Sequence, residues 1–514
     1  MKKSTIGFLV LILIGIGGLL AWKKLMPVLF KQQQEATSDA VKGVPLRIGG
    51  DNYLGYWFIT SQEMRKQAVR KGFHVDFTDD GGLYAERLDK FARGEYDCIV
   101  LPVNSYLEQG AAHKFPGVIV AAISESKGAD GVVAFADKLP SGKINDLNDP
   151  SLRFVYTADS PSSFLLDLTI TDFDLDQLHN DGGIRIKAEG SADVLAKAKA
   201  GEGDVFVLWE PDLSKALTLP GMKYVWGSDR FSGYIVDVFV FNRDFLASNK
   251  KVVSDFLTTY FRVMGLYANN RDNMLEEMAR SSHIKKEAVA EITAKIEWFD
   301  LAENSRLQFG ITTNPGGSAE EGIVNTIIGC TDVLLRNGRL QNDPLAGNPY
   351  LITNSSFLES LSKNNVLARS TGAPKKRTFA ELEPDAWSLL NEIGTFRIEP
   401  ITFQSWDNRL TEEGKARVDK IAGLLTNNYP GYRVIIRGHT GPGGDESENR
   451  KLSQERSDLV RQYLIAVHGI GSQRILAQGV GSQKPPRKKP GESPRAYRYR
   501  LPRVEFIAVE ENRL

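Results

Sequence analysis

The chain begins with a long uncharged segment, and this feature constrains its architecture more than any other. No charged residue lies between Lys3 and Lys23, and Ile6 to Trp22 is almost wholly apolar or glycine. As a helix with a rise of about 1.5 Å per residue, the segment spans roughly 28 Å, close to the thickness of a bilayer's hydrocarbon core. It contains no Asp, Glu, His or Arg, so it offers no proton or ion relay and is predicted to be an anchor.

A cleaved secretory signal is the alternative, because Lys2 and Lys3 supply the charged start that a signal needs. The apolar stretch is longer than a usual signal core, and Leu19 stands where a cleavage site wants a small residue. Residues 1–24 are therefore predicted to be an uncleaved transmembrane anchor, followed by a polar tether at 25–44. Lysines flank the span on both sides, so charge alone does not fix its orientation.

Composition narrows the class of protein further. The 514 residues carry 64 basic and 64 acidic side chains, and this zero net charge argues against a nucleic-acid partner. The two cysteines, Cys98 and Cys330, are too few for a disulfide scaffold or a four-thiolate metal site. Both have apolar neighbours and are predicted to be buried, unpaired thiols.

Beyond the tether, short β-like runs, among them 46–49, 74–78 and 184–188, alternate with helical stretches such as 58–71. This alternation predicts an α/β domain with a largely parallel sheet. We place this domain at residues 45–361. A segment rich in small and basic residues follows, giving a linker at 362–391. The last region, 392–514, is predicted to be a smaller α+β domain of βαβαβ type, with its first strand at 396–403.

Several short motifs follow one another in the middle domain. They are Tyr53-Leu54-Gly55-Tyr56-Trp57, Gly94-Glu95-Tyr96-Asp97, Gly201-Glu202-Gly203-Asp204 and Trp209-Glu210-Pro211. In this order they resemble periplasmic solute-binding proteins of ABC importers, most closely the nitrate/sulfonate/taurine type. The resemblance implies a two-lobed, type II-like clamp that closes on a small solute.

The clamp implies a ligand site between the lobes, at strand ends and helix N-termini that favour anionic groups. The expected solute is anionic or zwitterionic. Helix capping explains the candidate serines as well as ligand binding does. For the two candidate tryptophans, packing is a better explanation than ligand binding. The candidate ligand-binding residues are Asp51, Tyr53, Tyr56, Trp57, Asn104, Ser160, Ser162, Ser163, Trp209 and Glu210.

The sequence gives little support for an enzyme. Its six histidines show no metal-ligand spacing, and we expect no cofactor, no metal and no catalytic residue. The acidic alternation from Asp172 to Asp176 lacks the glycine and the glutamate that a calcium loop requires, and is expected to be a solvated turn.

A second, more specific series of motifs occupies the C-terminal region. It comprises Arg437-Gly438-His439-Thr440, Asn449-Arg450-Lys451-Leu452-Ser453-Gln454-Glu455-Arg456, Gly479-Val480-Gly481 and Arg503-Val504-Glu505-Phe506. The series resembles the OmpA-like peptidoglycan-binding domain. The resemblance implies that Thr440, Asn449, Arg456 and Arg503 contribute to peptidoglycan binding, with Arg456 holding the carboxylate of diaminopimelate.

One residue of that family's diaminopimelate-binding site is missing from this chain. The family has an Asp after Gly-His-Thr that pairs with the diaminopimelate ammonium, whereas this chain has Gly441. Either peptidoglycan binding is weakened, or Asp445 or Glu446 replaces the lost carboxylate, or the domain serves another partner. We also expect Arg456 in the first turn of a helix beginning near Ser453, where the helix dipole favours an anion.

Together these features predict an inner-membrane protein with a cytoplasmic N-terminus and its bulk in the periplasm. The expected partners are a small solute, peptidoglycan with weakened affinity, the inner membrane and a membrane protein complex, but no nucleic acid. The predicted function is solute sensing or transport, or envelope organisation. The alternative is a scaffold or stator-like component whose solute-binding fold has lost its ligand.

Overall fold

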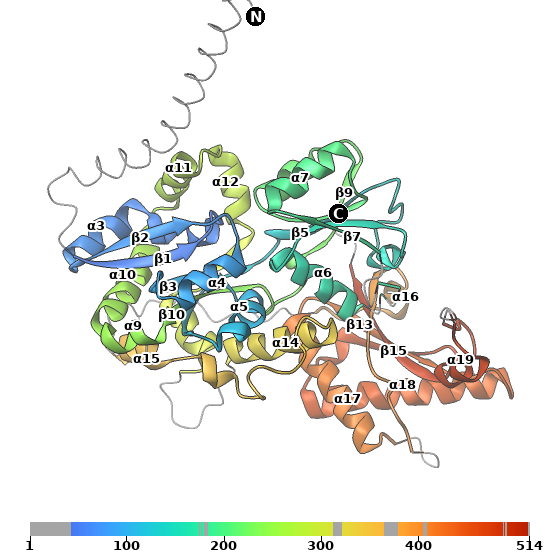
Figure 1. Cartoon of the computed structure of the whole chain (residues 1–514). Helices are drawn as coiled ribbons and strands as arrows, with labels where there is room; N and C mark the ends of the chain where they lie inside the picture. The colour runs from blue at the N-terminus through green and yellow to red at the C-terminus, as the bar shows by residue number, and fades with distance from the viewer. Residues whose placement is uncertain are drawn as a thin grey trace, which may run out of the picture.

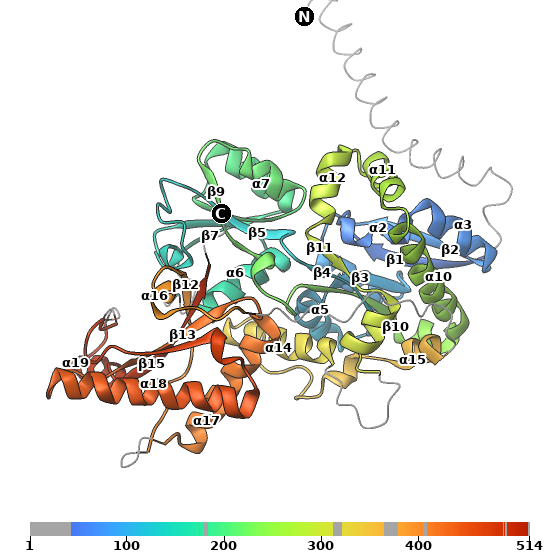
Figure 2. The same cartoon turned by 180° about the vertical axis from the view of Figure 1, so that it is seen from behind.

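The computed structural model describes residues 43–173, 175, 177–178, 183–311, 321–363, 379–404, 409–486, 488 and 491–511. These residues form three β-sheets with packed helices, seen as three bodies from the front and from behind (Figures 1 and 2). The predicted anchor lies outside the described residues, as does nearly all of the predicted tether. Within the described part of the chain, no helix has the length and apolar character needed to cross a membrane.

The first body, lobe one, is built on a six-stranded sheet of order β11-β4-β10-β3-β1-β2. All residues of its inner strands β3 and β4 are buried. Its strands are β1 (Val44–Gly50), β2 (Phe73–Asp79), β3 (Cys98–Pro102), β4 (Gly117–Ser126), β10 (Val236–Asn242) and β11 (Ile296–Trp298). Its helices are α2 (Trp57–Thr60), α3 (Gln62–Arg70), α4 (Tyr84–Ala92), α5 (Val103–Gly110), α9 (Arg243–Ser248), α10 (Lys250–Ala268), α11 (Arg271–Ser282), α12 (Lys286–Thr293), α13 (Leu301–Glu303) and α15 (Ser356–Lys363).

The second body, lobe two, is built on a five-stranded sheet of order β7-β6-β8-β5-β9. Its strands are β5 (Asp130–Phe135), β6 (Arg153–Thr157), β7 (Ile184–Ala188), β8 (Val205–Trp209) and β9 (Met222–Gly227). Its helices are α6 (Pro161–Asp172), α7 (Ser191–Ala200) and α8 (Asp212–Leu217). The chain passes from lobe one to lobe two between β4 and β5, and returns between β9 and β10.

Both sheets are mixed, so the prediction of a largely parallel sheet is wrong: three of the five strand pairs in lobe one and two of the four in lobe two are antiparallel. β1 pairs in parallel with β2 and β3, and β6 pairs in parallel with β7 and β8. β5 and β10, which follow the crossings between lobes, run antiparallel to both of their neighbours. Each of these two strands enters its sheet from the other lobe, so it does not pair with the strand that precedes it in the chain.

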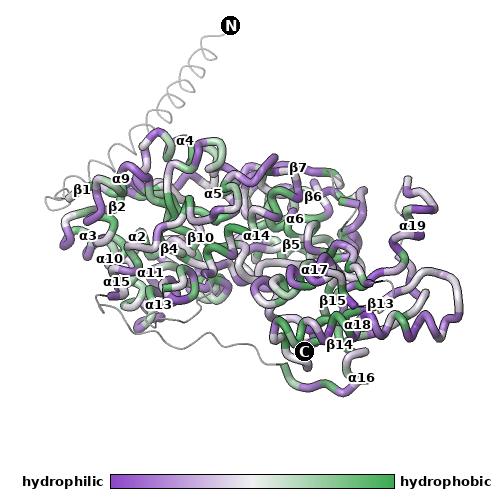
Figure 3. Tube along the Cα trace, turned by 90° about the horizontal axis from the view of Figure 1, so that it is seen from below, coloured by the Kyte–Doolittle hydropathy of each residue, from purple (hydrophilic) through white to green (hydrophobic). Residues whose placement is uncertain are grey.

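Two helices connect the bodies. Every residue of α6 is buried, from Pro161 at the boundary between the lobes to Asp172 beside the C-terminal domain. Helix α14 (Gly322–Arg336) packs against both α5 of lobe one and α6 of lobe two. Viewed from below, α14 lies between β10 and β5 and is strongly hydrophobic (Figure 3). The two lobes are therefore packed against a common helix on one side.

The third body is the C-terminal domain, whose four-stranded sheet has the order β12-β15-β13-β14. Its strands are β12 (Asn391–Phe396), β13 (Arg433–His439), β14 (Ile475–Gly479) and β15 (Arg503–Glu510). Its helices are α16 (Pro384–Trp387), α17 (Glu412–Gly423), α18 (Glu446–His468) and α19 (Pro494–Arg500).

Two sequence predictions for this domain are wrong. The first strand lies at 391–396 rather than 396–403, and Phe403 makes only an isolated bridge with Leu410. Helix α18 begins at Glu446, not near Ser453, because the Asp445 side chain caps it by accepting from the backbone N–H groups of Ser447 and Glu448. Arg456 therefore lies in the third turn, away from the helix N-terminus.

The C-terminal domain packs on lobe two through a buried group that we call the aromatic seam. Phe173 stacks on Phe396 with ring centroids 5.6 Å apart, and Trp226 stacks on Tyr432 at 6.5 Å. Burial raises the pKa of Asp172 to about 7, although the Tyr429 hydroxyl donates to its carboxylate at 2.6 Å. The aromatic seam consists of Asp172, Phe173, Trp226, Phe396, Tyr429 and Tyr432.

Both cysteines are buried and unpaired, as predicted. Cys98 lies in β3, in the middle of the lobe one sheet, and Cys330 lies in α14. Burial raises the pKa of the Cys98 thiol, so this side chain is a packing residue rather than a nucleophile.

Candidate functional site

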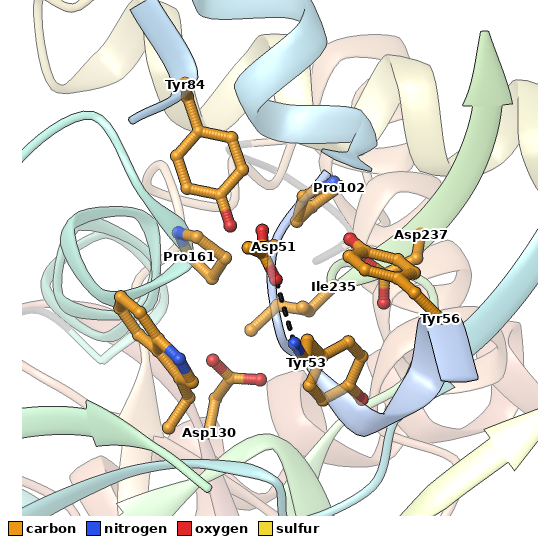
Figure 4. Close-up of a pocket in the computed structure, with 10 residues that line it drawn as sticks. Asp51, Tyr53, Tyr56, Tyr84, Pro102, Asp130, Pro161, Ile235 and Asp237 are labelled. Carbon is orange, nitrogen blue, oxygen red and sulfur yellow. Dashed lines mark hydrogen bonds between the residues drawn. The ribbon is translucent and has the colours of Figure 1, made fainter. Parts of the chain in front are cut away.

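A cavity that is partly open to solvent lies between the two lobes, and its space of about 300 Å³ includes some of that solvent. Lobe one and lobe two both contribute side chains to its wall (Figure 4). The lining residues are Asp51, Tyr53, Tyr56, Tyr84, Pro102, Asp130, Pro161, Trp209, Ile235 and Asp237.

The ends of strands and helices place these side chains. Asp51 and Tyr53 follow β1, Pro102 ends β3, and Tyr84 opens α4. From lobe two, Asp130 opens β5, Pro161 opens α6 and Trp209 ends β8. The wall is thus built where strand ends of both lobes face each other, as expected for an α/β clamp.

The Asp51 side chain is held by a buried arginine. Arg87 donates to Asp51 Oδ2 at 2.9 Å, to Asp80 Oδ2 at 2.7 Å and to the Val100 carbonyl. Burial raises the pKa of Asp51, while the Arg87 guanidinium opposes this shift. Because the Arg87 guanidinium is already paired with two carboxylates and a carbonyl, it is not available to bind an anionic ligand.

Asp130 and Asp237 have hydroxyl partners but no cationic partner among the described residues. Asp130 accepts from Ser126 Oγ at 2.6 Å, and Asp237 accepts from the Tyr56 hydroxyl and from Ser124 Oγ at 3.2 Å. Burial raises the pKa of Asp130 to about 7 and that of Asp237 to about 8, and neighbouring carboxylates add to both shifts.

Aromatic rings complete the wall. Tyr53 and Tyr56 meet edge to face, with ring centroids 5.3 Å apart. The Trp209 side chain reaches toward lobe one, because a Cβ on Gly82 would lie 3.9 Å from it. Tyr84 is 6% exposed and points its hydroxyl toward Asp51 in Figure 4. Within the described part of the chain, that hydroxyl has no hydrogen-bond partner.

Four of the predicted ligand-binding residues line the cavity, namely Asp51, Tyr53, Tyr56 and Trp209. The others do not, for identifiable reasons. Trp57 is 6% exposed in the core of lobe one, where its Nε1 donates to Ser281 and its ring meets Tyr267. Asn104 is fully buried in the first turn of α5, where it donates to Ser105.

The predicted serine site is a helix cap. Ser160 accepts from the Ser162 backbone N–H, and Ser163 completes a capping box with Ser160. All three serines are buried, and only their neighbour Pro161 reaches the cavity. Glu210 also points elsewhere, since it accepts from Lys295 and Ser214. The hydroxyl site expected for an anion is therefore absent from this wall.

Sequence reasoning missed Tyr84, Asp130 and Asp237, which are central to the wall. Asp237 could have been detected from the sequence, because it interrupts an apolar run between Val236 and Val238. A carboxylate in a buried strand is costly and therefore suggests a specific role. The charge of the lining follows from these residues. Among the described residues, the lining contains three carboxylates and no Lys, Arg or His, which does not favour the anionic form of the predicted anionic or zwitterionic solute.

In the C-terminal domain, two of the predicted peptidoglycan-binding residues keep unsatisfied polar atoms. The Arg456 guanidinium lies over the Phe403 ring at 5.2 Å, and its buried Nε has no hydrogen-bond partner among the described residues. The buried Thr440 Oγ1 is likewise without a partner there. Buried polar atoms are rarely left unpaired, so both suit an external ligand.

The other two predicted residues are engaged internally. Asn449 donates to the Gly443 carbonyl at 2.8 Å and so holds the loop before α18. Arg503 donates to Glu505 at 2.7 Å and to the Leu501 and Lys484 carbonyls. Asp445, considered above as a replacement carboxylate, serves as the cap of α18.

Comparison with known proteins supports the interpretation of this domain. Residues 402–499 match the OmpA family. The outer membrane porin F of Pseudomonas fluorescens is 38% identical over 73 residues, covering 14% of this chain and 22% of that protein. This chain spans between 22% and 33% of the length of the first curated relatives it matches. The predicted OmpA-like resemblance is confirmed for this region.

Solved structures resemble the remainder of the chain only distantly. The alkanesulfonate-binding protein SsuA from Xanthomonas axonopodis pv. citri, bound to MOPS, is 15% identical with a TM-score of 0.49, covering 62% of this chain and all of that one. The periplasmic nitrate-binding protein NrtA from Synechocystis PCC 6803 is 9% identical with a TM-score of 0.48, covering 63% and 90%. The two-lobed fold itself is established by the sheets and crossings described above.

Proposed function

We propose that this protein is a membrane-anchored periplasmic protein that joins a small-solute clamp to a peptidoglycan-associating domain. The cavity carries the first half of the proposal, because its wall is shared between two lobes that the chain crosses twice. Such a wall is complete only when the lobes are together, which is the arrangement a clamp requires. We propose a binding role rather than an enzymatic one, in solute sensing or delivery.

Native mass spectrometry of the intact chain, purified from its own envelope in mild detergent, tests the clamp. We expect a bound molecule of small mass that is lost on partial denaturation. The matched variants are Trp209→Ala, which opens the cavity wall, and Trp57→Ala, which removes a tryptophan outside the wall. Retention of the ligand by Trp209→Ala, or a parent chain that carries none, would count against the clamp.

The second half of the proposal is supported by the OmpA family match and by the unpaired Nε of Arg456. A carboxylate of the peptidoglycan stem would supply the acceptor that Arg456 lacks. The missing aspartate can be restored, because a Cβ on Gly441 would have Pro502 Cγ at 3.8 Å as its nearest neighbour. There is thus room for a side chain at this position.

Retention of the intact chain on purified sacculi tests this half. Because a charge-assisted hydrogen bond is worth about 1.5–3 kcal/mol, Gly441→Asp should strengthen retention about ten- to a hundredfold and Arg456→Ala should weaken it by a similar factor. Arg450→Ala, an exposed arginine on the same helix, is the control and should bind like the parent. Equal binding by Arg456→Ala and the parent would assign the domain another partner.

The proposed location rests on the uncharged N-terminal segment and on these two halves together. Peptidoglycan and imported solutes both occur outside the cytoplasm, so the N-terminus is placed in the cytoplasm and the bulk of the chain in the periplasm. The intact protein should fractionate with the inner membrane and retain residues 1–24. A mature chain that begins near Trp22 would show that the segment is a cleaved signal.

A further inference from the structure

The wall of the interlobe cavity is acidic on both sides. Asp51 and Asp237 come from lobe one and Asp130 from lobe two, and in the part of the chain that the structure describes they are the only ionisable acids or bases in the lining other than the tyrosines. The nearest cation, Arg87, is committed to Asp51, Asp80 and a carbonyl. Carboxylates that are brought together in a buried space are unfavourable unless they take up protons or a positive charge joins them.

A second observation concerns a tyrosine in the same wall. The Tyr84 side chain is 6% exposed, and its hydroxyl faces the open space of the cavity beside Asp51 without a hydrogen bond to any described residue (Figure 4). The ring of Tyr84 receives the Arg87 guanidinium on one face at 4.7 Å, so the hydroxyl is the part of this side chain that is available to a ligand. The free hydroxyl, the open volume and the carboxylates therefore converge on one unfilled position.

The geometry also limits the kind of cation. Within the described residues, no three His, Cys, Asp or Glu side chains lie close enough together to hold a metal ion. The carboxylates instead surround a volume of about 300 Å³ that is walled by the rings of Tyr53, Tyr56 and Trp209. Aromatic faces bind ammonium groups, quaternary ones included, through cation–π attraction.

We propose that the interlobe cavity binds a small organic cation, whose ammonium group lies among Asp51, Asp130 and Asp237 and against the aromatic wall. The inference rests on the proposed clamp and replaces the anionic solute predicted from the sequence. A zwitterion fits only through its ammonium group. Figure 4 shows the carboxylates of Asp51 and Asp130 at the open space of the cavity, and that of Asp237 beside the Tyr56 ring, whose hydroxyl donates to it.

Isothermal titration calorimetry of the intact chain in detergent provides the test. The cationic probes are choline and ethanolamine. The neutral probe is 3,3-dimethylbutan-1-ol, which has the shape of choline without its charge, and the anionic probe is ethanesulfonate. We expect at least one cation to bind, the neutral isostere to bind at least about tenfold more weakly than choline, and ethanesulfonate not to bind.

Asparagine substitutions identify the carboxylates. Asp130→Asn and Asp237→Asn should each weaken cation binding about ten- to a hundredfold, since each removes a charge-assisted contact while keeping the side-chain shape. Asp172→Asn is the matched control, because this aspartate is also buried in lobe two but lies in the aromatic seam. It should bind like the parent. Melting temperatures of all variants show whether each is folded, and Trp209→Ala provides a second test in the same wall.

The outcomes separate this inference from the proposed clamp. If ethanesulfonate or the neutral isostere binds as tightly as the cations, and Trp209→Ala abolishes that binding, the clamp stands and the cationic class is wrong. If both cations fail to bind, the inference is overturned. If in addition the chain from its own envelope carries no small molecule, the clamp fails with it.

Discussion

Lobe two meets the rest of the molecule on two sides, and a buried aspartate stands at each. Asp130 faces lobe one across the cavity, and Asp172 faces the C-terminal domain in the aromatic seam. Burial raises the pKa of each carboxyl to about 7. Both aspartates thus carry a similar cost of desolvation.

The two sides differ in what compensates that cost. In the seam, Tyr429 donates to Asp172 and rings close around the pair, with Phe173 and Tyr429 centroids 5.9 Å apart. In the cavity, Asp130 has Ser126 as a partner, but it also borders the open space, and the Tyr84 hydroxyl lies across that space beside Asp51 (Figure 4). A buried acid satisfied by its own chain stabilises an interface, whereas one with unfilled surroundings is suited to a ligand.

Truncating one tryptophan on each side should give the largest contrast. Trp226→Ala empties the seam of a side chain that is 1% exposed and should lower the free energy of unfolding by about 3–5 kcal/mol. Trp209→Ala, in the cavity wall, should melt near the parent but lose stabilisation by ligand, which is about 2.7 kcal/mol at a hundred times the dissociation constant. Thermal unfolding of both variants with and without choline measures this. If both variants were destabilised by a similar amount without ligand, the seam and the cavity would not differ in their contribution to stability.

Removing the hydroxyl of Tyr429 should have a smaller effect. Tyr429→Phe leaves the buried Asp172 carboxylate without its donor and should cost about 1–3 kcal/mol at pH 8, where that carboxyl is ionised. Asp172→Asn keeps an acceptor for Tyr429 and should cost less. Denaturant unfolding compares the variants, and equal stability of Tyr429→Phe and the parent would show that the seam does not depend on this bond.

The pH dependence of stability should distinguish the two sides. Because folding raises the pKa values of Asp130, Asp172 and Asp237, the folded state holds protons that the unfolded state has released between about pH 4 and pH 8. Their contribution is therefore most favourable at low pH and is lost as pH rises, by at most about 1.4 kcal/mol per pH unit for each group. Saturating choline should reduce the part of this pH dependence that comes from Asp130 and Asp237. Asp172→Asn should remove the part that comes from the aromatic seam. Melting temperatures across this range, with and without choline, provide the measurement.

The smallest effect is expected for Tyr84→Phe. Since its hydroxyl has no partner in the described chain, its loss should change the stability of the ligand-free protein by no more than about 0.5 kcal/mol. Tyr56→Phe is the matched control and should cost more, because the Tyr56 hydroxyl donates to Asp237. A large loss for Tyr84→Phe would reveal a partner and weaken the case for an unfilled position.

The sequence predicted the elements of the fold better than their pairing. Strand-like runs at 46–49, 74–78 and 184–188 lie within β1, β2 and β7, because apolar periodicity is a local property. The helix expected over 58–71 is divided at Ser61, which caps α3. The antiparallel insertion of β5 and β10 could not be predicted, since it depends on the path between lobes rather than on local pattern.

The candidate site was predicted only in part. The residues found, such as Tyr53 and Trp209, lie in motifs at strand ends, which a strand-by-strand analysis detects. The residues missed, Asp130 and Asp237, lie at the start of or inside strands and reach the cavity because the two lobes are apposed. The charge of the wall is a property of that apposition, so it did not enter the sequence prediction of an anionic or zwitterionic solute.

Helix α6 joins the two sides that have been compared. Its first residue, Pro161, lines the cavity, and its last, Asp172, receives Tyr429 of the C-terminal domain. Twelve residues at about 1.5 Å each separate these ends by roughly 18 Å, and all of them are buried, so the helix has little freedom to bend. An axial displacement of α6 at the cavity would therefore move its other end, in the aromatic seam, by a similar distance.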